Sequence, residues 1–421
     1  MKRVLGAQAI SVTAAALRAA PVVGSVDPAE LAELADPSFS NEVIHWQKQH
    51  GRHALPWQNT RDAYRIWLSE IMLQQTQVAA VIPYYQRFLQ RFPDLDSLAS
   101  APSEDVMAHW SGLGYYSRAR NLHRCAQRVV AEHGGVFPAD PLLLAELPGI
   151  GRSTAAAIAA FAYGTRAAIL DGNVKRVFAR VFGVAGYPGE KAVENLLWRR
   201  AVALLPQAAE SQPVGSQVES QVESYTQGLM DLGATLCSRN KPRCGTCPLM
   251  QRCVAYAEGR VHELPSRKPK KALPERQTAM LIITDGNRVL LQQRPDSGIW
   301  GGLLSLPELD PSTGTADQAR FDAALSQAVA PFGVPGSCEP MAAFAHVFTH
   351  FKLHITPYHV RLAQRLDMAA QDNHVWYAVD KLAGAPLPAP VKKLLLAIFS
   401  EAAAVDEPIG RLRSNAAASM T

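Results

Sequence analysis

The stretch 147–173 constrains the fold most, because it contains two turns that flank one short Ala-rich helix. In the first turn, LPGIG, Pro148 ends the preceding helix, and Gly149 and Gly151 can adopt positive φ and leave their N–H groups uncovered. A hydroxyl side chain, of Ser153 or its neighbour, can then cap the next helix. Backbone N–H groups at a helix start form an anion site, although an ordinary glycine turn between packed helices has the same pattern.

Asp171 begins the second turn and precedes an apolar series at helical spacing, which is typical of any helix N-cap. Together, the first turn, the Ala-rich helix and the sequence LDGNV resemble the helix-hairpin-helix DNA glycosylase superfamily. The resemblance implies that Asp171 lies at the scissile sugar and that Asn173 supports the sugar or a phosphate. It also implies DNA-backbone contacts for the hairpin residues Gly149, Gly151 and Ser153.

The whole chain of 421 residues, 48% of them hydrophobic, predicts two or three domains with well-filled cores. Its net charge of +5 is compatible with a polyanionic partner but too small to argue for one. No apolar run reaches the roughly 18 residues of a membrane span, so we expect no membrane partner. Residues 1–36 are predicted to be a poorly ordered extension, for which an organelle-targeting role stays open, and residues 401–421 to be a tail.

The segment 64–78 has a helical period that places one glutamate, Glu70, in a partly apolar stripe. The predicted face consists of Ile66, Trp67, Glu70, Leu73, Gln74 and Gln77. Desolvation there would raise the pKa of Glu70 toward the range of a general acid, whereas the helix alone favours a glutamate at the edge of the stripe, facing water. The run SEIMLQQTQV resembles the signature of adenine DNA glycosylases of the MutY type, which implies that Glu70 is the acid.

The loop GLGYY, residues 112–116, precedes three arginines, Arg118, Arg120 and Arg124. Glycines beside exposed aromatic rings suit a loop that pushes a ring between bases, with arginines that meet phosphates. A plain helix connector with core tyrosines fits equally well. The same family has this loop, and the resemblance implies that Tyr115 and Gln75 enter the duplex and help to extrude the target nucleotide. Trp57 would form a wall of the base pocket.

Four of the six cysteines lie within seventeen positions, which indicates a metal site. These are Cys237, Cys244, Cys247 and Cys253. Zinc is the main rival, but zinc ribbons usually have two C-x2-C pairs and this chain has one. The spacing resembles the [4Fe-4S] loop of the endonuclease III and MutY branches, which implies a structural cluster. It would tie down a loop whose basic residues, Arg239, Lys241, Arg243 and Arg252, can face phosphates.

Cysteine usage of this kind favours a reducing compartment, so we expect a cytoplasmic, nucleoid-associated protein. Cys125 and Cys338 are expected to be ordinary buried thiols. The helical glycosylase domain is predicted to span 37–257, with a low-complexity surface insertion at 207–224 that contains a tandem SQVE repeat. Residues 258–277 are rich in Lys, Arg and Pro and predict a linker, which lies along nucleic acid or is simply solvated.

Beyond the linker the pattern changes to alternating strands, beginning with a hairpin at 279–293. We therefore predict a mainly α N-terminal domain followed by an α/β domain at 278–400, which resembles the Nudix-like domain of MutY-type enzymes. A Nudix hydrolase holds Mg²⁺ with a glutamate-rich helix, and this chain has no such run, so pyrophosphatase activity is not expected. By resemblance, Phe348, Thr349 and His350 match a Phe-Ser-His loop that contacts 8-oxoguanine, with Thr349 as a conservative departure.

The histidines at 346, 350, 354 and 359 do not have a spacing that would bring them together on one metal. The resemblance implies cleavage of adenine mispaired with 8-oxoguanine or guanine in double-stranded DNA, by a protein acting as a monomer. Asp171 would stabilise the oxocarbenium-like sugar or form a transient covalent intermediate. Bifunctional members have a lysine nucleophile where this chain has Ser153, so a monofunctional glycosylase is predicted. An endonuclease III-type enzyme and a non-catalytic DNA-binding redox sensor are the alternatives.

Overall fold

The structure is a computed structural model that describes residues 28–206, 217–268, 272–295, 298–309, 318–366 and 373–405. Its residues group into two compact units, each described in turn. The first comprises Met1–Arg52, Ala139–Ala145 and Ala155–Arg267, and the second His53–Pro138, Glu146–Thr154 and Lys268–Thr421, as far as these ranges are described. Most of the predicted extension and tail, residues 1–27 and 406–421, lies outside the described residues.

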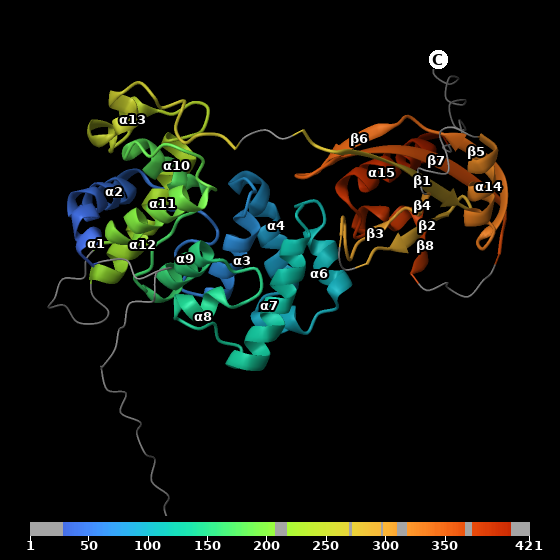
Figure 1. The fold of residues 1–421 in the computed structure, drawn as a ribbon. Helices are drawn as coiled ribbons and strands as arrows, with labels where there is room; N and C mark the ends of the chain where they lie inside the picture. Colours follow the sequence, from blue (N-terminus) through green and yellow to red (C-terminus); the bar gives the residue numbers. More distant parts are fainter. Residues whose placement is uncertain are drawn as a thin grey trace, which may run out of the picture. The chain divides into compact units, whose positions relative to one another are not determined.

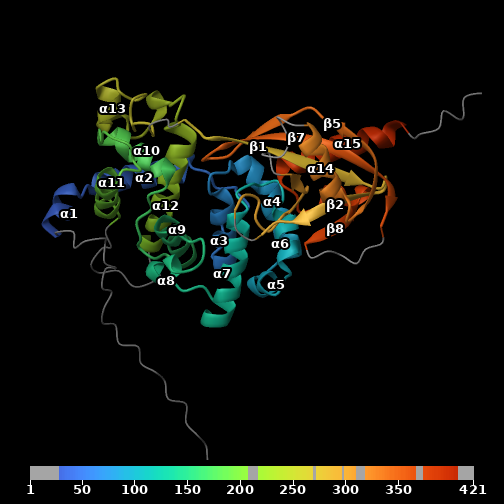
Figure 2. The ribbon, with the colours of Figure 1, turned by 45° about the vertical axis from the view of Figure 1, so that its right-hand side comes forward.

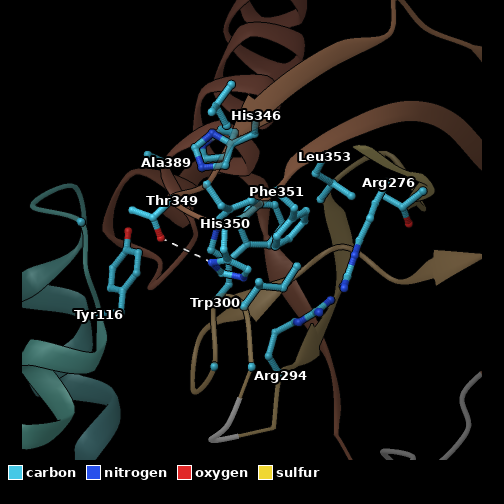
Figure 3. Close-up of a pocket in the computed structure, with 18 of the residues that line it drawn as sticks. Tyr116, Arg276, Arg294, Trp300, His346, Thr349, His350, Phe351, Leu353 and Ala389 are labelled. Atoms are coloured by element: carbon cyan, nitrogen blue, oxygen red, sulfur yellow. Dashed lines mark hydrogen bonds between the residues drawn. The ribbon is translucent and has the colours of Figure 1, made fainter. Parts of the chain in front are cut away.

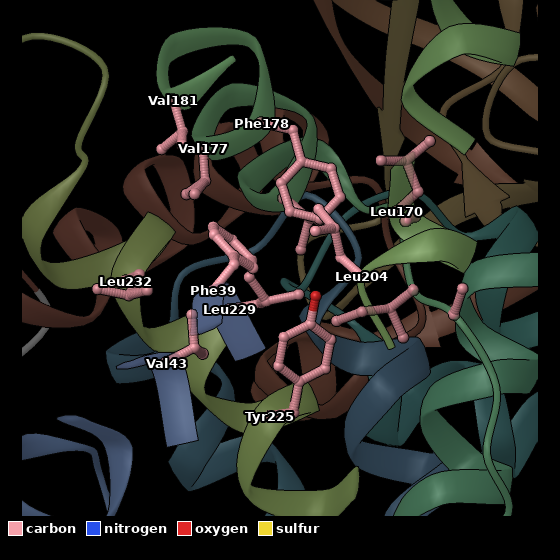
Figure 4. Close-up of a cluster of buried hydrophobic side chains, with 14 of the residues drawn as sticks. Phe39, Val43, Leu170, Val177, Phe178, Val181, Leu204, Tyr225, Leu229 and Leu232 are labelled. Atoms are coloured by element: carbon pink, nitrogen blue, oxygen red, sulfur yellow. The ribbon is translucent and has the colours of Figure 1, made fainter. Parts of the chain in front are cut away.

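The first unit is helical (Figure 1). Its elements are α1 (Pro28–Leu34), α2 (Pro37–His50), α8 (Pro141–Ala145), most of α9 (Arg152–Tyr163), α10 (Gly172–Val181), α11 (Lys191–Ala203), α12 (Gln217–Asp231), the π-helical turn η1 (Leu232–Leu236), η2 (Cys244–Thr246), η3 (Met250–Arg252) and α13 (Val254–Ala257). Buried side chains from α2, α10 and α12 form its core, among them Phe39, Phe178, Tyr225 and Leu229 (Figure 4).

Two segments that were predicted to be irregular are helical. Helix α1 lies within the predicted extension, and its Glu30 forms an ion pair with Arg199 of α11 (2.9 Å). Helix α12 begins at Gln217, so the low-complexity insertion is helical from there on, while residues 207–216 lie outside the described part. The four-residue SQVE repeat is close to the helical period and keeps Val222 on the buried side, at 1% exposure. The helical spacing of the repeat therefore determines its structure, although its composition is typical of an irregular segment.

The second unit begins with α3 (Ala63–Leu73), α4 (Val78–Arg91), α5 (Leu95–Ala99), α6 (Ser103–Trp110) and α7 (Ser117–His133). The aromatic rings of Trp67, Phe88 and Trp110 are fully buried among these helices. The prediction of one helix through 64–78 was wrong, because α3 ends at Leu73 and a turn at Gln75 with φ of 56° separates it from α4. Gln74 and Gln77 therefore do not share a helix face with Glu70.

A mixed sheet forms the rest of the second unit (Figures 1 and 2). Its strands are β1 (Glu275–Thr284), β2 (Arg288–Gln293), β3 (Leu304–Ser305), β4 (Glu308–Leu309), β5 (Gly333–Pro340), β6 (Phe344–Val347), β7 (Lys352–Arg365) and β8 (His374–Ala378). They run in the order β3-β2-β1-β7-β5, with β4 on β1, β6 on β7 and β8 on β2. The central pair, β1 and β7, is parallel, and the predicted hairpin of β1 and β2 is confirmed.

Helices α14 (Gln318–Val329) and α15 (Ala389–Val405) accompany this sheet, with the short 3-10 helix η5 (Val379–Gly384) before α15. The predicted linker 258–277 is shorter than expected at both ends, because Val261 and Leu264 are buried beside α13 and β1 begins at Glu275. Residues 269–271 of that linker lie outside the described residues. In the part of the chain that is described, no helix combines the length and apolarity needed to cross a membrane.

Candidate functional site

Asp171 is the N-cap of α10, as its sequence context predicts. Its Oδ1 accepts a hydrogen bond from the Val174 N–H (2.7 Å), and its Oδ2 accepts one from Nδ2 of Asn173 (3.2 Å). Burial raises the pKa of Asp171, while these hydrogen bonds and the nearby Arg176 charge oppose the rise. The site thus holds a carboxylate that is largely withdrawn from water yet has fixed hydrogen-bond donors.

Arg176, one turn along α10, joins Asn173 to the cysteine loop. Its Nη2 donates to Oδ1 of Asn173 (2.9 Å) and to the Gly233 carbonyl (2.7 Å), and its Nε donates to the Cys237 carbonyl (2.7 Å). A glycine is required at 233, because a Cβ there would lie 2.5 Å from Cβ of Asn173. The orientation of Asn173, and through it of Asp171, is therefore coupled to the position of Cys237.

The four clustered cysteines line one small cavity together with residues of α10 and η1. Buried Arg180 holds the rim, because it donates to the carbonyls of Ser238 (2.8 Å) and Leu264 (2.9 Å) and to Sγ of Cys237 (3.3 Å). Among the described residues, no three His, Cys, Asp or Glu side chains converge closely enough to hold a metal ion. The four thiols nevertheless line one cavity, and thiolate donors suit zinc or an iron–sulfur cluster.

The basic residues of this loop are not all available to phosphates, contrary to the prediction. Arg252 forms ion pairs with Asp36 (2.5 Å) and Glu42 (2.9 Å), and so ties the loop to the start of α2. Arg243 donates to the Thr235 carbonyl (2.8 Å). Arg239 and Lys241 are exposed.

Glu70 lies in the second unit, near the end of α3, and is partly buried. Ile66 and Trp67, one turn before it, are buried, so the predicted apolar stripe exists at this point. Trp57 is also buried, with its ring edge-on to Tyr85 at a centroid distance of 5.4 Å. Glu70 and Asp171 belong to different units, and their meeting in one pocket stays a prediction.

Gln75 and Tyr115 are exposed and both have left-handed backbone angles, φ 56° and 49°. The arginines after Tyr115 were predicted to meet phosphates, and for buried Arg118 this was wrong. Arg118 is buried and donates to backbone carbonyls around both residues, and Arg120 donates to the Gly301 carbonyl. The sequence signal that was missed is the helical spacing, which points Arg118 back over the preceding loop.

The LPGIG turn is formed as predicted at one of its two glycines. Gly149 has φ of 79°, and a Cβ there would lie 2.8 Å from Cβ of Asn121. Gly151 has no positive φ and is exposed, with open space where a Cβ would be. Helix α9 begins at Arg152, so the partly buried Ser153 lies in its first turn.

A second cavity, of about 1190 Å³, lies within the second unit. The loop residues 114–116 line it on one side, and residues 346–351 on another, so Tyr116 lies beside Thr349 (Figure 3). The Phe348 N–H donates to the Phe351 carbonyl (2.8 Å), and the two rings stack with centroids 4.6 Å apart. This closes a tight turn that presents Thr349 and His350 to the cavity, where Oγ1 of Thr349 lies 3.4 Å from Nδ1 of His350.

Trp300 supports this turn and was not identified from the sequence. Its ring lies 5.5 Å from that of Phe348 and 5.9 Å from that of His346, and its backbone is left-handed, with φ of 54°. The glycines on either side of it, in the sequence GIWGG, are the signal that could have indicated such a turn. The loop after α6 is joined to the segment before α15, because the hydroxyls of Ser111 and Tyr116 both donate to the Leu387 carbonyl (3.3 Å each).

The remaining histidines and cysteines have local roles. His354 bonds to Glu275 (2.8 Å), whereas His359 contacts the Phe399 ring. Cys125 is buried, as predicted, and burial raises its pKa to about 12. Cys338 is exposed on β5, so the prediction of a buried thiol was wrong there, because β5 turns most of its side chains outward.

Comparisons with known proteins agree with this arrangement. A family model described as the HhH-GPD superfamily base excision DNA repair protein matches residues 68–202, and one described as a NUDIX domain matches residues 278–397. The predicted fold class is therefore confirmed. A solved structure of a thermostable thymine-DNA glycosylase, 29% identical, covers 52% of this chain and 96% of its own with a TM-score of 0.45.

Two curated relatives match most of the chain. The adenine DNA glycosylase of Buchnera aphidicola subsp. Acyrthosiphon pisum (strain APS) is 35% identical over 359 residues, which are 85% of this chain and 96% of that protein. The adenine DNA glycosylase of Mus musculus is 34% identical over 434 aligned residues, covering 88% of this chain and 80% of that protein. Both relatives match most of the chain at more than 30% identity, and the two domain models match its helical part and its mixed sheet. The chain therefore belongs to the adenine DNA glycosylase family.

Proposed function

We propose that this protein releases adenine that is mispaired with 8-oxoguanine or guanine in double-stranded DNA. The observation that carries the proposal is the cavity of about 1190 Å³, which the loop 114–116 and the turn 348–351 line together. A loop that enters the duplex and a turn that reads the opposite base must act on the same base pair. Thr349 supplies a hydroxyl, and His350 a ring nitrogen, for hydrogen bonds to an oxidised purine.

Two carboxyl groups perform the cleavage. Glu70 acts as the general acid that protonates the leaving adenine, at N7, and Asp171 acts as the anion that stabilises the oxocarbenium-like sugar or forms a transient covalent bond. The fixed donors on Asp171 support this role, because they favour its ionised form against burial. Asn173 supports the sugar or a phosphate. The adenine has to leave the stack, and Trp57 forms a wall of the pocket that receives it.

Gly149, Gly151 and Ser153 grip the DNA backbone at the start of α9, where backbone N–H groups and Arg152 favour an anion. The enzyme is monofunctional, because Ser153 cannot form a Schiff base with the abasic sugar. Lys175, the amine one turn beyond Asp171, is engaged in an ion pair with Glu194 (2.5 Å).

The cysteine loop holds a [4Fe-4S] cluster, with Cys237, Cys244, Cys247 and Cys253 as ligands. When bound, the cluster supplies a covalent tie between the two ends of the loop rather than a reacting group. Arg180 at Sγ of Cys237 and the shared cavity support this assignment over four unrelated thiols. The protein acts as a monomer on DNA in the cytoplasm, at the nucleoid.

A duplex with a single adenine opposite 8-oxoguanine tests the proposal. Wild type should release the adenine, whereas Asp171→Asn and Glu70→Gln should not. A Ser153→Ala variant should still cleave, since Ser153 is assigned binding alone. Efficient trapping of a DNA adduct by borohydride would contradict the monofunctional assignment and favour an endonuclease III-type lyase. Unchanged DNA binding with no release by any variant would favour the redox sensor instead.

A further inference from the structure

Gln75 and Tyr115 share an unusual backbone conformation. Both residues have positive φ, 56° and 49°, and Tyr115 is 47% exposed. L residues crowd the backbone in this region, so a side chain other than glycine stays there only where its surroundings hold it. The Gln75 side chain is exposed, and the Tyr115 ring lies over the guanidinium of Arg118, which is 5.4 Å from the ring centroid.

A single guanidinium holds the peptide bond that precedes each of these residues. Nη1 of Arg118 donates to the Gln74 carbonyl (2.6 Å), and Nη2 donates to the Gly114 carbonyl (3.2 Å). These carbonyls belong to the peptide bonds that lead into Gln75 and Tyr115. Both turns are therefore attached to the two ends of one planar, rigid group.

The same two nitrogens of Arg118 also bind the flanks of the two turns. Nη2 also donates to Oγ1 of Thr76 (3.1 Å) and to the Leu113 carbonyl (3.3 Å). Nη1 caps the end of α3 at the carbonyls of Ile71 (3.0 Å) and Met72 (2.8 Å). The guanidinium thus also joins both turns to the helix that contains Glu70.

The position of Arg118 in its own helix does not account for these contacts. It is the second residue of α7, where the helix dipole disfavours a cation, and it is only 7% exposed. A buried charge is costly unless its donors are used, and here the acceptors come from the two turns and the end of α3. The contribution of Arg118 to the structure is therefore its set of hydrogen bonds to the two turns.

We propose that Arg118 is a positioning residue for base extrusion. It fixes the turns at Gln75 and Tyr115 as one rigid wedge, so that both side chains enter the duplex together. The guanidinium itself contacts neither DNA nor adenine. This proposal rests on the proposed function, because it assumes that these two side chains act on DNA.

The first test is hydrogen exchange of the full chain without DNA. Arg118→Met should speed exchange in both turns, at the amides of residues 73–77 and 111–116, and leave the sheet of β1 and β7 unchanged. Arg65→Met is the control, since Arg65 is an exposed residue of α3 that pairs only loosely with Asp62 (3.3 Å). Faster exchange in one turn alone, or in neither, overturns the proposal.

The second test measures extrusion with 2-aminopurine opposite 8-oxoguanine, in an Asp171→Asn background that leaves the base attached. Arg118→Met should weaken extrusion about tenfold while the wedge is intact, but hardly at all when Gln75→Ala and Tyr115→Ala are also present. A general loss of folding would lower extrusion equally in both backgrounds. Equal losses therefore overturn the proposal.

Arg118→Lys keeps the proposal testable where Arg118→Met does not fold. A lysine ammonium is a compact point charge and cannot span both carbonyls, so at least one turn should loosen. Wild-type exchange and extrusion in Arg118→Lys would contradict the proposal. Failure of wild type to release adenine would reject the proposed function alone, because the exchange experiment does not depend on activity.

Discussion

Asp171 and Asp36 are both N-caps, yet their environments shift their pKa values in opposite directions. Burial raises the pKa of Asp171. Burial alone would also raise that of Asp36, but hydrogen bonds from Ser38, Phe39 and Arg252 outweigh it and lower the pKa. A raised pKa gives stability that is lost as pH rises through the folded value, and a lowered pKa gives stability that is lost as pH falls through it.

We therefore expect Asp171→Asn to become more stable than wild type as pH rises above 3.8, the ordinary value, and the gain to level off above the folded pKa. Asp36→Asn should be less stable than wild type at neutral pH, with the difference fading in acid. Adenine release by Asp171→Asn should fall by at least about a hundredfold. Urea unfolding between about pH 2 and 8 measures the two stabilities, and an Asp171→Asn protein that is less stable at neutral pH would contradict the burial argument.

Gln75 has a strained backbone and an exposed side chain, so a substitution there can raise the stability of the protein while it lowers activity. Gln75→Gly relieves the left-handed strain and should raise the free energy of unfolding by about 1 kcal/mol. Gln75→Ala keeps the strain and should bring no gain. Both variants lack the side chain that enters the duplex, so both should extrude the base less well. Thermal unfolding and adenine release measured together decide this, and equal stabilities of the two variants would count against strain at this position.

At single residues, the sequence predicts local patterns better than it predicts long-range contacts. The N-cap at Asp171 and the turn at Gly149 follow from neighbouring residues and are present. The break after Leu73 was missed, because Gln74, Gln75 and Gln77 have good helix propensity. The turn is held by Arg118, which donates to the Gln74 carbonyl from 44 residues away. The helical spacing of α7 directs Arg118 back over the preceding loop, but it does not identify the turn at Gln75 as the partner.

Within the second unit, Arg120 joins helix α7 to the loop that contains Trp300. This residue donates to the Gly301 carbonyl, next to Trp300, whose ring supports Phe348. Arg120→Met should let the turn at Thr349 and His350 move. A hydrogen bond to a charged group contributes about 1.5 kcal/mol, so the preference for 8-oxoguanine over guanine opposite adenine should fall by about tenfold.

Single-turnover adenine release from the two duplexes measures that preference. Arg124→Met is the matched control on α7, because Arg124 is exposed and bonds to Asn121 (2.6 Å) rather than to the sheet. It should change the rates on both duplexes by the same factor and leave their ratio unchanged. A reduced ratio in both variants would indicate a general effect of charge.

Among elements, the strands and helices with a clear hydrophobic period could be predicted from the sequence. Which of the two compact units each element joins could not be predicted. The hairpin of β1 and β2 was recognised from its alternation and its Gly-containing turn. The parallel pairing of β1 with β7 joins residues 275–284 to 352–361, and no local pattern identifies that partner. The grouping of 53–138 with the sheet likewise depends on contacts such as those at Leu387 and Gly301.

At the scale of the whole molecule, the cysteine loop unites distant parts of the first unit. Arg252 bonds to Asp36 and Glu42 before and within α2, Arg180 bonds to Leu264, and Arg176 bonds to Asn173 beside Asp171. Arg176 and Arg180 donate to carbonyls of this loop, and Arg252 lies within it, so the contacts of all three depend on its shape. The proposed cluster should therefore stabilise the whole first unit and orient Asp171.

Removing the iron from the full chain tests this coupling. We expect faster hydrogen exchange in the cysteine loop, at the start of α10 and at the start of α2, together with slower adenine release, because Arg176 no longer holds Asn173. The sheet of β1 and β7, in the second unit, should exchange as before. Cys247→Ser should reproduce the loss of iron, whereas Cys338→Ser, an exposed thiol on β5, should retain it. Iron loss that leaves residues 171–176 fully protected would mean that helix α10 is held by its own apolar core, and that the arginine contacts follow the loop without orienting Asp171.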